Sequence, residues 1–412
     1  MINRFQTRCL ICSHFNTLRI TLGVDAIQEH SFKCMGCGEP NKVRLNIDFV
    51  KRQEIPQLKE FGISMPSVKF TCLENCETCD EEGSITNFDP TFLMPEEMLH
   101  QDRVFPWMTE FPKFVNTVGL KTFSQKKVDI IHAIGGQRNL RDLLDTLVKA
   151  YRLHNRGQSD LSNQQLAKVK ELLGMPEPPV LMQAIFLTAS TFLGQSRQNE
   201  VMSLTQEIRR SKNSNETEFQ RFRTEYYQER FDDLINRQIE IISEYLSGYD
   251  QFIQTWLYAS LAKPIDSPYI ASSKDLQKIK MFYGNAFEEL SAGLFLPACL
   301  NNITCGRDYD QFDQMSLTKY LGINKANRAN PFIENHEFYL LHDEFDSTLR
   351  NSTHHRGFRL ANESKEIIEY RSGDAGQWKR MHYTEYLLKC NKIMFCMMRL
   401  LSMQVLVAHD MI

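Results

Sequence analysis

The sequence has little excess charge of either sign and no long hydrophobic run. Its 412 residues carry a formal net charge of −3 at pH 7, so no overall positive field attracts nucleic acid and any RNA contact must come from local patches. Lys389, Lys392 and Arg399 interrupt the apolar C-terminal segment, and its longest uncharged stretch is too short to cross a bilayer. The N-terminal residues lack the apolar segment of a signal peptide. We therefore expect a soluble, cytoplasmic protein without a membrane partner.

Nucleotide-binding fingerprints, internal repeats, low-complexity tracts and a disulfide framework are absent as well. Gly135 and Gly136 have the spacing of neither glycine-rich phosphate loop. Seven of the eleven cysteines fall in the first 80 residues with metal-like spacings, which is not the pattern of a disulfide-stapled secreted domain. The length of the chain and its 42% hydrophobic residues suffice for two or three domains with ordinary cores.

The first cysteines form two C-x2-C pairs of the kind that binds zinc. The pairs are separated by 21 residues, and four thiolates in two such pairs suit one tetrahedral metal ion. Strand-like segments accompany them, and the whole resembles a zinc ribbon in which the metal replaces a hydrophobic core. With four protein ligands the zinc has no open position, so we expect it to be structural. The ligands are Cys9, Cys12, Cys34 and Cys37, and the strand-like segments are 18–22, 30–33 and 43–47.

A second cysteine cluster follows as Cys72-x3-Cys76-x2-Cys79. Three thiols within eight residues favour a metal site, whose fourth ligand would be His100, Asp80 or a residue from elsewhere. Two alternatives remain open. The cluster could be half of a second zinc ribbon, or the thiols could be reduced and unliganded.

Most of the remaining sequence has the apolar periodicity of helices. A polar stretch at 209–215 predicts a linker, and we place the start of a C-terminal helical domain directly after it. The proline-rich stretch 174–179 is a further boundary candidate. The predicted helical segments are 141–151, 164–173, 180–204 and 216–246.

The most informative stretch lies near the C-terminus, where residues 349–357 read Leu-Arg-Asn-Ser-Thr-His-His-Arg-Gly. A guanidinium grips phosphate bidentately and stays charged, and a histidine exchanges a proton near pH 7. No acidic residue lies between Arg350 and Arg359. These two residue types are the groups needed to cut RNA without a metal.

The flanking residues predict that this motif occupies the last turn of one amphipathic helix. An Asn-Pro pair at 330–331 has the composition of a helix start, and apolar residues then recur at helical spacing over 338–349. On a regular helix, positions i and i+4 share a face. By that rule His354, and not His355, would lie beside Arg350.

Arg350-Asn351-x-x-x-His355 resembles the Arg-x4–6-His signature of the HEPN superfamily, which comprises helical RNA-binding and RNA-cleaving domains. A polar residue directly after the arginine is the usual nuclease form. A hairpin-like segment follows at 366–370 and 378–382, and a long apolar helix closes the chain. The resemblance covers roughly the last half of the chain and is specific only around residues 335–408.

The resemblance implies a metal-independent endoribonuclease that works as a homodimer, with two copies of the motif in one composite site. A ribose 2′-hydroxyl would attack its own 3′-phosphate and leave a 2′,3′-cyclic phosphate and a 5′-hydroxyl. His355, or His354 if helix geometry sets the register, would be the general base or acid. Arg350 would stabilise the transition state, and Asn351 would orient the histidine or a phosphate oxygen. Arg356 and Arg359 are assigned to RNA binding.

Other interpretations of the same residues stay open. Arg350 could pair with Asp346 on a helix surface, and the two histidines could be solvated residues at a helix end. A HEPN domain can also bind RNA or a partner without cutting. A zinc-ribbon DNA-binding regulator with a helical dimerisation domain is the remaining alternative.

The sequence thus predicts a mainly α chain with a small β zinc ribbon, a helical middle region and a HEPN-like helical bundle that carries a small hairpin insertion. The resemblance implies that the function is RNA cleavage by a toxin-like hydrolase of a bacterial abortive-infection or other antiviral system, without a catalytic metal, and the cysteine pairs predict structural zinc. Expected partners are RNA, a second copy of the chain and a phage component or regulatory protein. The predicted parts are the zinc ribbon at 1–50, a β-rich extension with the second cysteine cluster at 51–100, a helical region at 101–215 and the HEPN-like domain at 216–412.

Overall fold

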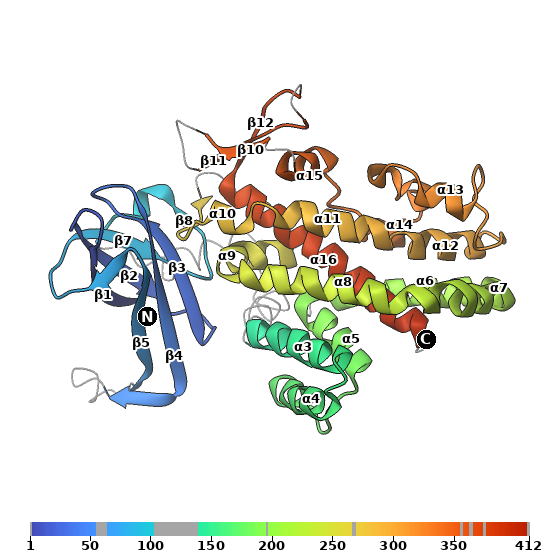
Figure 1. Ribbon diagram of the computed structural model, residues 1–412, viewed down its shortest axis with the longest axis horizontal. Coiled ribbons are helices and arrows are strands. Elements are labelled where there is room, and N and C mark those ends of the chain that lie inside the picture. The colour runs from blue at the N-terminus through green and yellow to red at the C-terminus, as the bar shows by residue number, and fades with distance from the viewer. Residues whose placement is uncertain are drawn as a thin grey trace, which may run out of the picture. The chain divides into compact units, whose positions relative to one another are not determined.

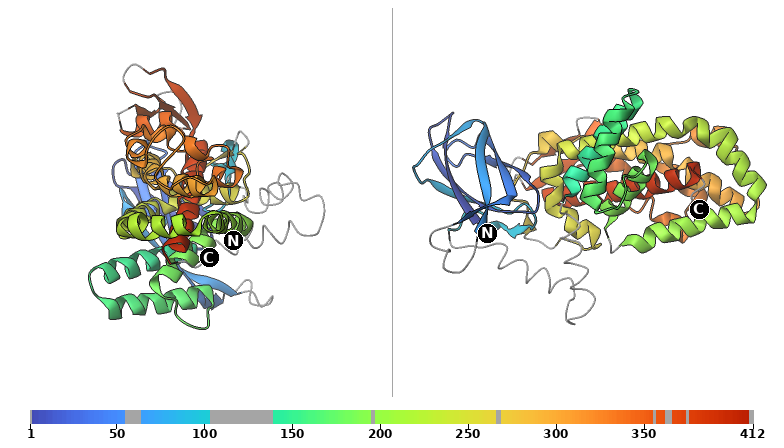
Figure 2. Two further views of the ribbon diagram at one scale, coloured as in Figure 1. Left: turned by 90° about the vertical axis from the view of Figure 1, so that its right-hand side faces the viewer. Right: turned by 90° about the horizontal axis from the view of Figure 1, so that it is seen from below.

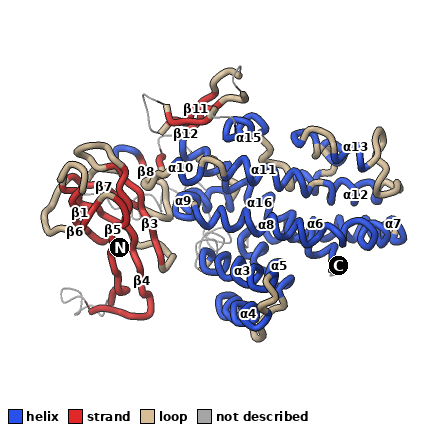
Figure 3. Tube along the Cα trace, in the orientation of Figure 1, coloured by secondary structure: helices blue, strands red, loops and turns tan. Residues whose placement is uncertain are grey.

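The computed structural model (Figure 1) describes residues 2–54, 64–102, 139–194, 197–265, 269–354, 357–361, 366–373 and 376–409. The chain divides into two compact units. Unit 1 comprises residues 1–138, 249–258 and 262–277, and unit 2 comprises residues 139–248, 259–261 and 278–412. Figure 3 shows that strands dominate the described part of unit 1 and helices that of unit 2.

Unit 1 is built on two small sheets. The first has the order β6-β1-β2-β7, in which β2 and β7 are parallel and the other pairs antiparallel. The second has the antiparallel order β3-β4-β5. A two-stranded pair, β8 with β9, completes the unit. The strands are β1 (Ile2–Cys9), β2 (Phe15–Thr21), β3 (Ile27–Lys33), β4 (Pro40–Glu54), β5 (Ser64–Glu74), β6 (Cys76–Thr78), β7 (Ser84–Phe88), β8 (Met94–Pro95) and β9 (Tyr269–Ile270), with a 3-10 turn η2 at Glu96–Met98.

Both sheets share one hydrophobic core. Along β4 the side chains of Val43, Leu45 and Ile47 are buried while their neighbours are more exposed, the period-two pattern of a half-buried strand. They pack in one cluster with β2 residues and with Phe88 of β7. The predicted strands are confirmed, but the expectation that metal replaces a core here is wrong. The core also spans the predicted boundary at residue 50, because Cys76 and Phe88 belong to it.

A segment distant in sequence completes unit 1. It includes residues 249–258 of α9 (Tyr249–Ser260) and residues 269–277. Ser273 Oγ accepts a 2.9 Å hydrogen bond from the Ser31 amide, and Ser272 Oγ accepts one of 3.1 Å from the Asp89 amide. No local pattern indicates this connection, because such pairings join residues more than 180 positions apart.

Unit 2 is a helical bundle around α16 (Tyr383–Ala408), which packs against α5, α6, α8 and α11 (Figure 2). By length and composition α16 could cross a membrane, but 94% of its apolar window is buried inside the protein, as expected for a core helix. Its Arg399 is neutralised there by Glu200, with Nε to Oε2 at 2.9 Å. The other elements are α3 (Leu140–Asn155), α4 (Ser159–Leu173), α5 (Leu181–Leu193), α6 (Gln198–Ser214), α7 (Glu216–Arg221), the π-helical turn η4 (Phe222–Tyr227), α8 (Gln228–Ser247), α11 (Phe282–Gly293), α12 (Phe295–Thr304), α13 (Leu317–Leu321), η5 (Lys325–Asn327), η6 (Asn330–Phe332), α14 (His336–Tyr339) and α15 (Ser347–His354). The boundaries between the units follow residues 138, 248, 258, 261 and 277, and the last of them lies within α10 (Leu276–Ile279).

Most predicted helices are confirmed, and three details are corrected. The one helical segment predicted at 180–204 is two helices, because α5 ends before Gly194 and α6 begins at Gln198. The predicted linker at 209–215 is wrong, because 209–214 form the end of α6, where buried Ser211 donates a 2.9 Å hydrogen bond to the Leu300 carbonyl. The single helix from 330 to the motif is also wrong. Asn335 caps α14, and Asp346 accepts a 2.9 Å bond from the Leu349 amide at the start of α15. Two capping side chains therefore begin separate short helices.

The predicted hairpin is confirmed and gains a third strand. The antiparallel sheet has the order β10-β11-β12, and the strands are β10 (Phe358–Leu360), β11 (Ile367–Tyr370) and β12 (Lys379–His382). The sheet lies beside α15 and leads directly into α16 (Figure 1).

Candidate functional site

The four N-terminal thiols come together as predicted. Their sulfur atoms all lie within 4.8 Å of one another, with Cys9 Sγ to Cys37 Sγ at 3.8 Å and Cys12 Sγ to Cys34 Sγ at 3.6 Å. A tetrahedral site with metal–sulfur bonds of about 2.3 Å needs sulfurs about 3.8 Å apart. None of the four is in a disulfide. The group can therefore hold one metal ion.

The local backbone explains why this arrangement forms. The first pair lies on the tight turn after β1 and the second on the turn after β3. The Gly38 amide bonds the Cys34 carbonyl at 2.8 Å, and Gly38 has a positive φ of 77°, which glycine adopts without strain. Burial would raise the pKa of Cys34, but amide donors of Cys37 and Gly36 and the neighbouring thiols lower it to about 7. A thiol with a lowered pKa is more readily a thiolate ligand, which singles out Cys34. For Cys12 and Cys37 a backbone hydrogen bond lowers the pKa, but burial and neighbouring thiols raise it overall.

The second cysteine cluster does not form a comparable group. Cys76 lies in the hydrophobic core, and its Sγ donates to the Lys42 carbonyl at 3.6 Å. Cys79 Sγ donates to the Glu81 carbonyl at 3.6 Å, and His100 Nδ1 bonds the Ile85 carbonyl at 2.9 Å. Among the described residues, three or more possible metal-ligand atoms lie close together only in the N-terminal group of four thiols. The metal site predicted at Cys72, Cys76 and Cys79 stays a prediction.

Arg350 is held at the junction of α15 and α11. It forms an ion pair with Glu288 of α11, and its Nη1 donates a 2.7 Å hydrogen bond to Asn351 Oδ1. Glu288 forms a second ion pair with Lys325 of η5. Burial alone would raise the pKa of Glu288, but Lys325 and then Arg350 lower it. One carboxylate therefore serves two cations, which leaves an excess positive charge at the site.

The alternative pairing of Arg350 with Asp346 is not found. The Asp346 side chain caps α15 and lies 3.8 Å from Lys389 Nζ. Arg350 thus faces another helix and is fixed by tertiary contacts.

His354 lies on the side of α15 that approaches α11 and α8. A Cβ added at Gly284 of α11 would lie 2.8 Å from His354 Nε2 and would collide with Thr353 Oγ1. Glu244 of α8 is close enough for His354 to influence its titration. Burial raises the pKa of Glu244, while hydrogen bonds from Asn285 and the charge of His354 oppose the rise. The motif therefore has a carboxylate near its first histidine, and only a glycine at 284 permits this approach.

The other predicted contact residues have different outcomes. His355 and Arg356 lie outside the described residues. Arg359 of β10 donates from Nη2 to Glu369 at 3.0 Å, and its guanidinium carbon lies 4.3 Å from the centre of the Trp378 ring. Arg380 binds the other oxygen of Glu369 at 2.8 Å, and the two arginines lower the pKa of this carboxyl. Arg359 and Arg380 nevertheless keep 54% and 56% of their side chains exposed, so this sheet presents guanidinium groups to solvent.

The sheet is joined to the motif helix by side-chain contacts. Asn351 Nδ2 donates to Ser372 Oγ at 3.1 Å, and Lys379 Nζ donates to Thr348 Oγ1 at 3.5 Å. The sequence missed Gly284, Glu288 and Glu244 as neighbours of the motif. A Gly-x-x-x-Glu spacing on α11 places two of them on one helix face, but that pattern is too common to have singled them out.

No protein-family model, no curated protein and no solved structure matches this chain.

Proposed function

We propose that the protein is a metal-independent endoribonuclease whose unit 2 is a HEPN-like domain. The observation that carries the proposal is the cluster on α15, in which Arg350 is oriented by Glu288 and Asn351 while His354 lies one turn further along. RNA cleavage by the ribose 2′-hydroxyl needs proton transfer and charge stabilisation but no metal.

Each residue of the cluster has a role that its contacts support. Arg350 would bind the oxygens on which charge develops as the 2′-oxygen attacks phosphorus. Its side chain is 30% exposed, so it is positioned and still accessible. A fixed guanidinium needs little reorganisation during the reaction, which makes its electrostatic contribution larger than that of a free arginine.

Two proton transfers are required, because the 2′-hydroxyl loses a proton and the 5′-oxygen gains one. His354 is next to Glu244 and Gly284, and His355 fits the family spacing. One chain can supply both groups, or two copies can each supply one across a two-fold axis. The homodimer of the sequence prediction would place two such clusters in one composite site.

The sheet β10-β11-β12 would guide the RNA strand to this cluster. Arg359 and Arg380 both bind Glu369, and more than half of each side chain is exposed. Phosphate oxygens are the natural ligands of exposed guanidinium groups. Arg356 would extend the same surface.

The N-terminal metal centre, with zinc as the ion that four thiolates favour, would have a structural role. Unit 1 would then select RNA or sense a phage component or regulatory partner in the cytoplasm. Deleting residues before 216 is not a clean test, because unit 1 also includes 249–258 and 262–277 and unit 2 begins at 139. Substituting metal ligands in the full chain is the better experiment.

The test is cleavage of a mixed RNA pool in EDTA by the wild type and by Arg350→Ala, His354→Ala and His355→Ala. We expect cyclic-phosphate ends, and a loss of roughly 100-fold or more with Arg350→Ala, the usual effect of removing such a group. Loss with only one histidine variant would identify the proton-transfer residue. Arg210→Ala and His336→Ala are matched controls, because both side chains lie at exposed positions away from the cluster.

A second candidate function is RNA binding without cleavage. It is favoured by the contacts that already occupy Arg350, since a carboxylate paired with the guanidinium competes with phosphate. In that case Arg350→Ala weakens RNA binding, and RNA incubated with the wild type keeps its length under every condition that supports binding.

A further inference from the structure

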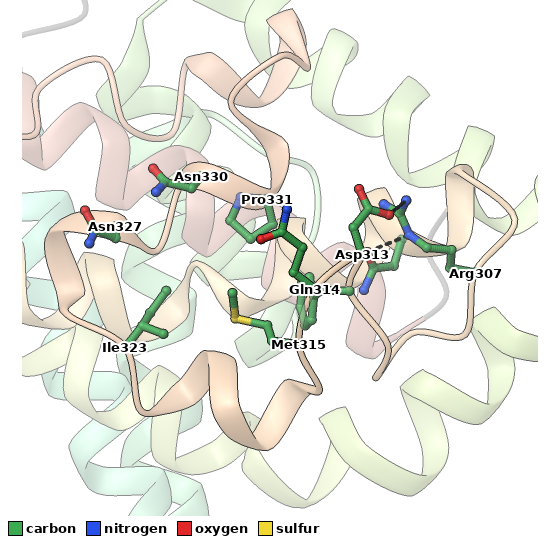
Figure 4. Close-up of a pocket in the computed structure, with 10 residues that line it drawn as sticks. Arg307, Asp313, Gln314, Met315, Ile323, Asn327, Asn330 and Pro331 are labelled. Carbon is green, nitrogen blue, oxygen red and sulfur yellow. Dashed lines mark hydrogen bonds and ion pairs between the residues drawn. The ribbon is translucent and has the colours of Figure 1, made fainter.

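Unit 2 contains a pocket of about 290 Å³ that none of the roles above uses. It is formed by the C-terminal part of α12, the loop before α13 and the segment from Ile323 to Pro331 (Figure 4). Figure 4 shows Arg307 and Asp313 on one side of the pocket and Asn327 with Asn330 on the other. A volume near 300 Å³ is at the lower end of the range for small-molecule sites, so the occupant would be about the size of one nucleoside.

The pocket is held in shape by its surroundings. Asn301 Nδ2 donates to the Pro331 carbonyl at 3.0 Å, and Tyr320 Oη donates to the Arg328 carbonyl at 2.7 Å. The ring of Phe312 stacks on that of Tyr320, with centroids 4.8 Å apart. These contacts fix the lining segments before any ligand arrives, which reduces the entropy lost on binding.

The lining has apolar walls and amide edges. Phe312, Met315 and Ile323 provide apolar surface, while Gln314 and Asn327 provide side-chain amides. A nucleobase has two apolar faces and hydrogen-bond donors and acceptors around its edge. Amides, which carry both donors and acceptors, are the side chains that read such edges, and apolar or aromatic groups cover the faces.

The charges of the lining also favour a neutral group. Arg307 forms an ion pair with Asp313, and its Nε donates to Asn302 Oδ1 at 3.3 Å. The guanidinium is therefore compensated inside the pocket. A phosphate would find no uncompensated cation among the described lining residues, whereas an uncharged base meets no electrostatic penalty.

The pocket is connected to the motif through one 3-10 turn. Asn327 lines the pocket, and Lys325 of the same turn η5 pairs with Glu288, the carboxylate that also holds Arg350. A base in the pocket would thus have Lys325 near its own backbone phosphate and Arg350 further along. Lys325 and Arg350 both belong to unit 2, as the pocket does.

We propose that this pocket binds a single unpaired base of the RNA strand and so sets the position of the bond cut at the Arg350 cluster. The proposal rests on the proposed nuclease function and adds the substrate class: single-stranded RNA with a preferred base beside the cleavage position. Base pairing would hide the edge that Gln314 and Asn327 read, so duplex RNA would be excluded.

The experiment measures binding and cutting separately in the full chain. Binding is measured with fluorescein-labelled 2′-O-methyl RNA hexamers, one for each base, which cannot be cut because they lack the attacking 2′-hydroxyl. A 2′-O-methyl hexamer with an abasic position is the reference. The variants are Asn327→Ala and Gln314→Ala, which remove edge contacts, and Met315→Trp, which fills the pocket. Gln311→Ala is the control, since Gln311 is exposed in the same loop and does not line the pocket. Thermal unfolding confirms that each variant is folded.

We expect the wild type to prefer one base by at least roughly fivefold over the abasic hexamer, the size of one good edge contact. The three pocket variants should lose this preference, and Gln311→Ala should keep it. The proposal that the pocket binds a base would be overturned by equal affinity for all hexamers, by equal affinity of wild type and pocket variants, or by no RNA binding. If Asn327→Ala cut RNA at the same positions as the wild type, the base-binding role of the pocket would be refuted and the proposed nuclease function would stand. If the wild type showed a base preference that the variants lose but cut no RNA, the base-binding role of the pocket would be supported and the proposed nuclease function would be refuted.

Discussion

Gly284→Ala tests whether the close approach of α15 to α11 controls the motif. In an exposed helix interior, glycine to alanine stabilises a protein by about 1 kcal/mol, because alanine has the higher helix propensity. Gly284 is buried, and its new Cβ would collide with Thr353 Oγ1 and lie 2.8 Å from His354 Nε2. The sign of the effect therefore depends on whether these atoms can move.

The obstruction should outweigh the propensity gain. The Thr353 hydroxyl is not free to swing away, because it donates a 2.8 Å bond to the Arg350 carbonyl and is buried. Overpacking of this kind costs about 1–3 kcal/mol. After subtracting about 1 kcal/mol of propensity, we expect a net destabilisation of about 0–2 kcal/mol. Because relief comes from moving α15, the Arg350–Glu288 pair should be displaced and RNA cutting reduced roughly 100-fold, more than the stability change explains.

Urea unfolding followed by far-UV circular dichroism measures the stability change, and the RNA-pool assay measures cutting. Gly322→Ala is the matched control, because its Cβ would meet nothing nearer than 3.4 Å. Thr353→Ala combined with Gly284→Ala should recover part of the lost stability, since the two changes meet at one contact. If Gly284→Ala were about 1 kcal/mol more stable than the wild type with unchanged RNA cutting, the packing argument would be refuted.

Three further predictions concern both units. Glu288→Gln should lower RNA cutting by misplacing Arg350, whereas Glu289→Gln, on the same helix, should leave the rate unchanged; equal rates in all three proteins would contradict the positioning role. In unit 1, burial raises the pKa of Asp89 to about 6 and lowers that of His30 to about 4. The folded state binds the Asp89 proton more tightly than the unfolded state does, so Asp89 contributes about 3 kcal/mol of stability at low pH, and this is lost as the pH rises from about 4 to 6. His30 has the opposite effect. The folded state binds its proton more weakly, so the free energy of unfolding gains about 3 kcal/mol as the pH rises from about 4 to 6.5. The two effects of pH on the free energy of unfolding nearly cancel in the wild type. In Asp89→Asn only the His30 effect remains, so stability should rise with pH over this range, and in His30→Gln only the Asp89 effect remains, so stability should fall. Parallel profiles of unfolding free energy against pH for the two variants would refute this. Stripping the metal under mild denaturation should lower the thermal midpoint of unit 1 without unfolding it, because a hydrophobic core remains, and complete loss of its strand signal would show that the core is insufficient.

Features that depend on residues close together in the chain could be predicted from local patterns. Two C-x2-C pairs on turns are enough to predict the four-thiol group, since each pair needs only a local bend. The strands between the pairs, β2 and β3, belong to different sheets, which the spacing did not indicate. Period-two alternation located the strands around 43–47, and helical periodicity located α3, α4, α8 and α16. The Arg350 motif could be found because its members are adjacent in the chain.

The residues that surround those features depend on tertiary packing and could not be predicted. The helix into the motif is broken because Asn335 and Asp346 each cap a new helix, and Leu341 between them is buried. The capping residues are local signals, but the burial of Leu341 depends on tertiary packing. Unit 1 is completed by residues 249–258 and 262–277, and Arg350 is oriented by Glu288, more than 60 positions away in the chain. Such contacts depend on how separate helices and sheets bury their apolar faces against each other, which no local spacing encodes.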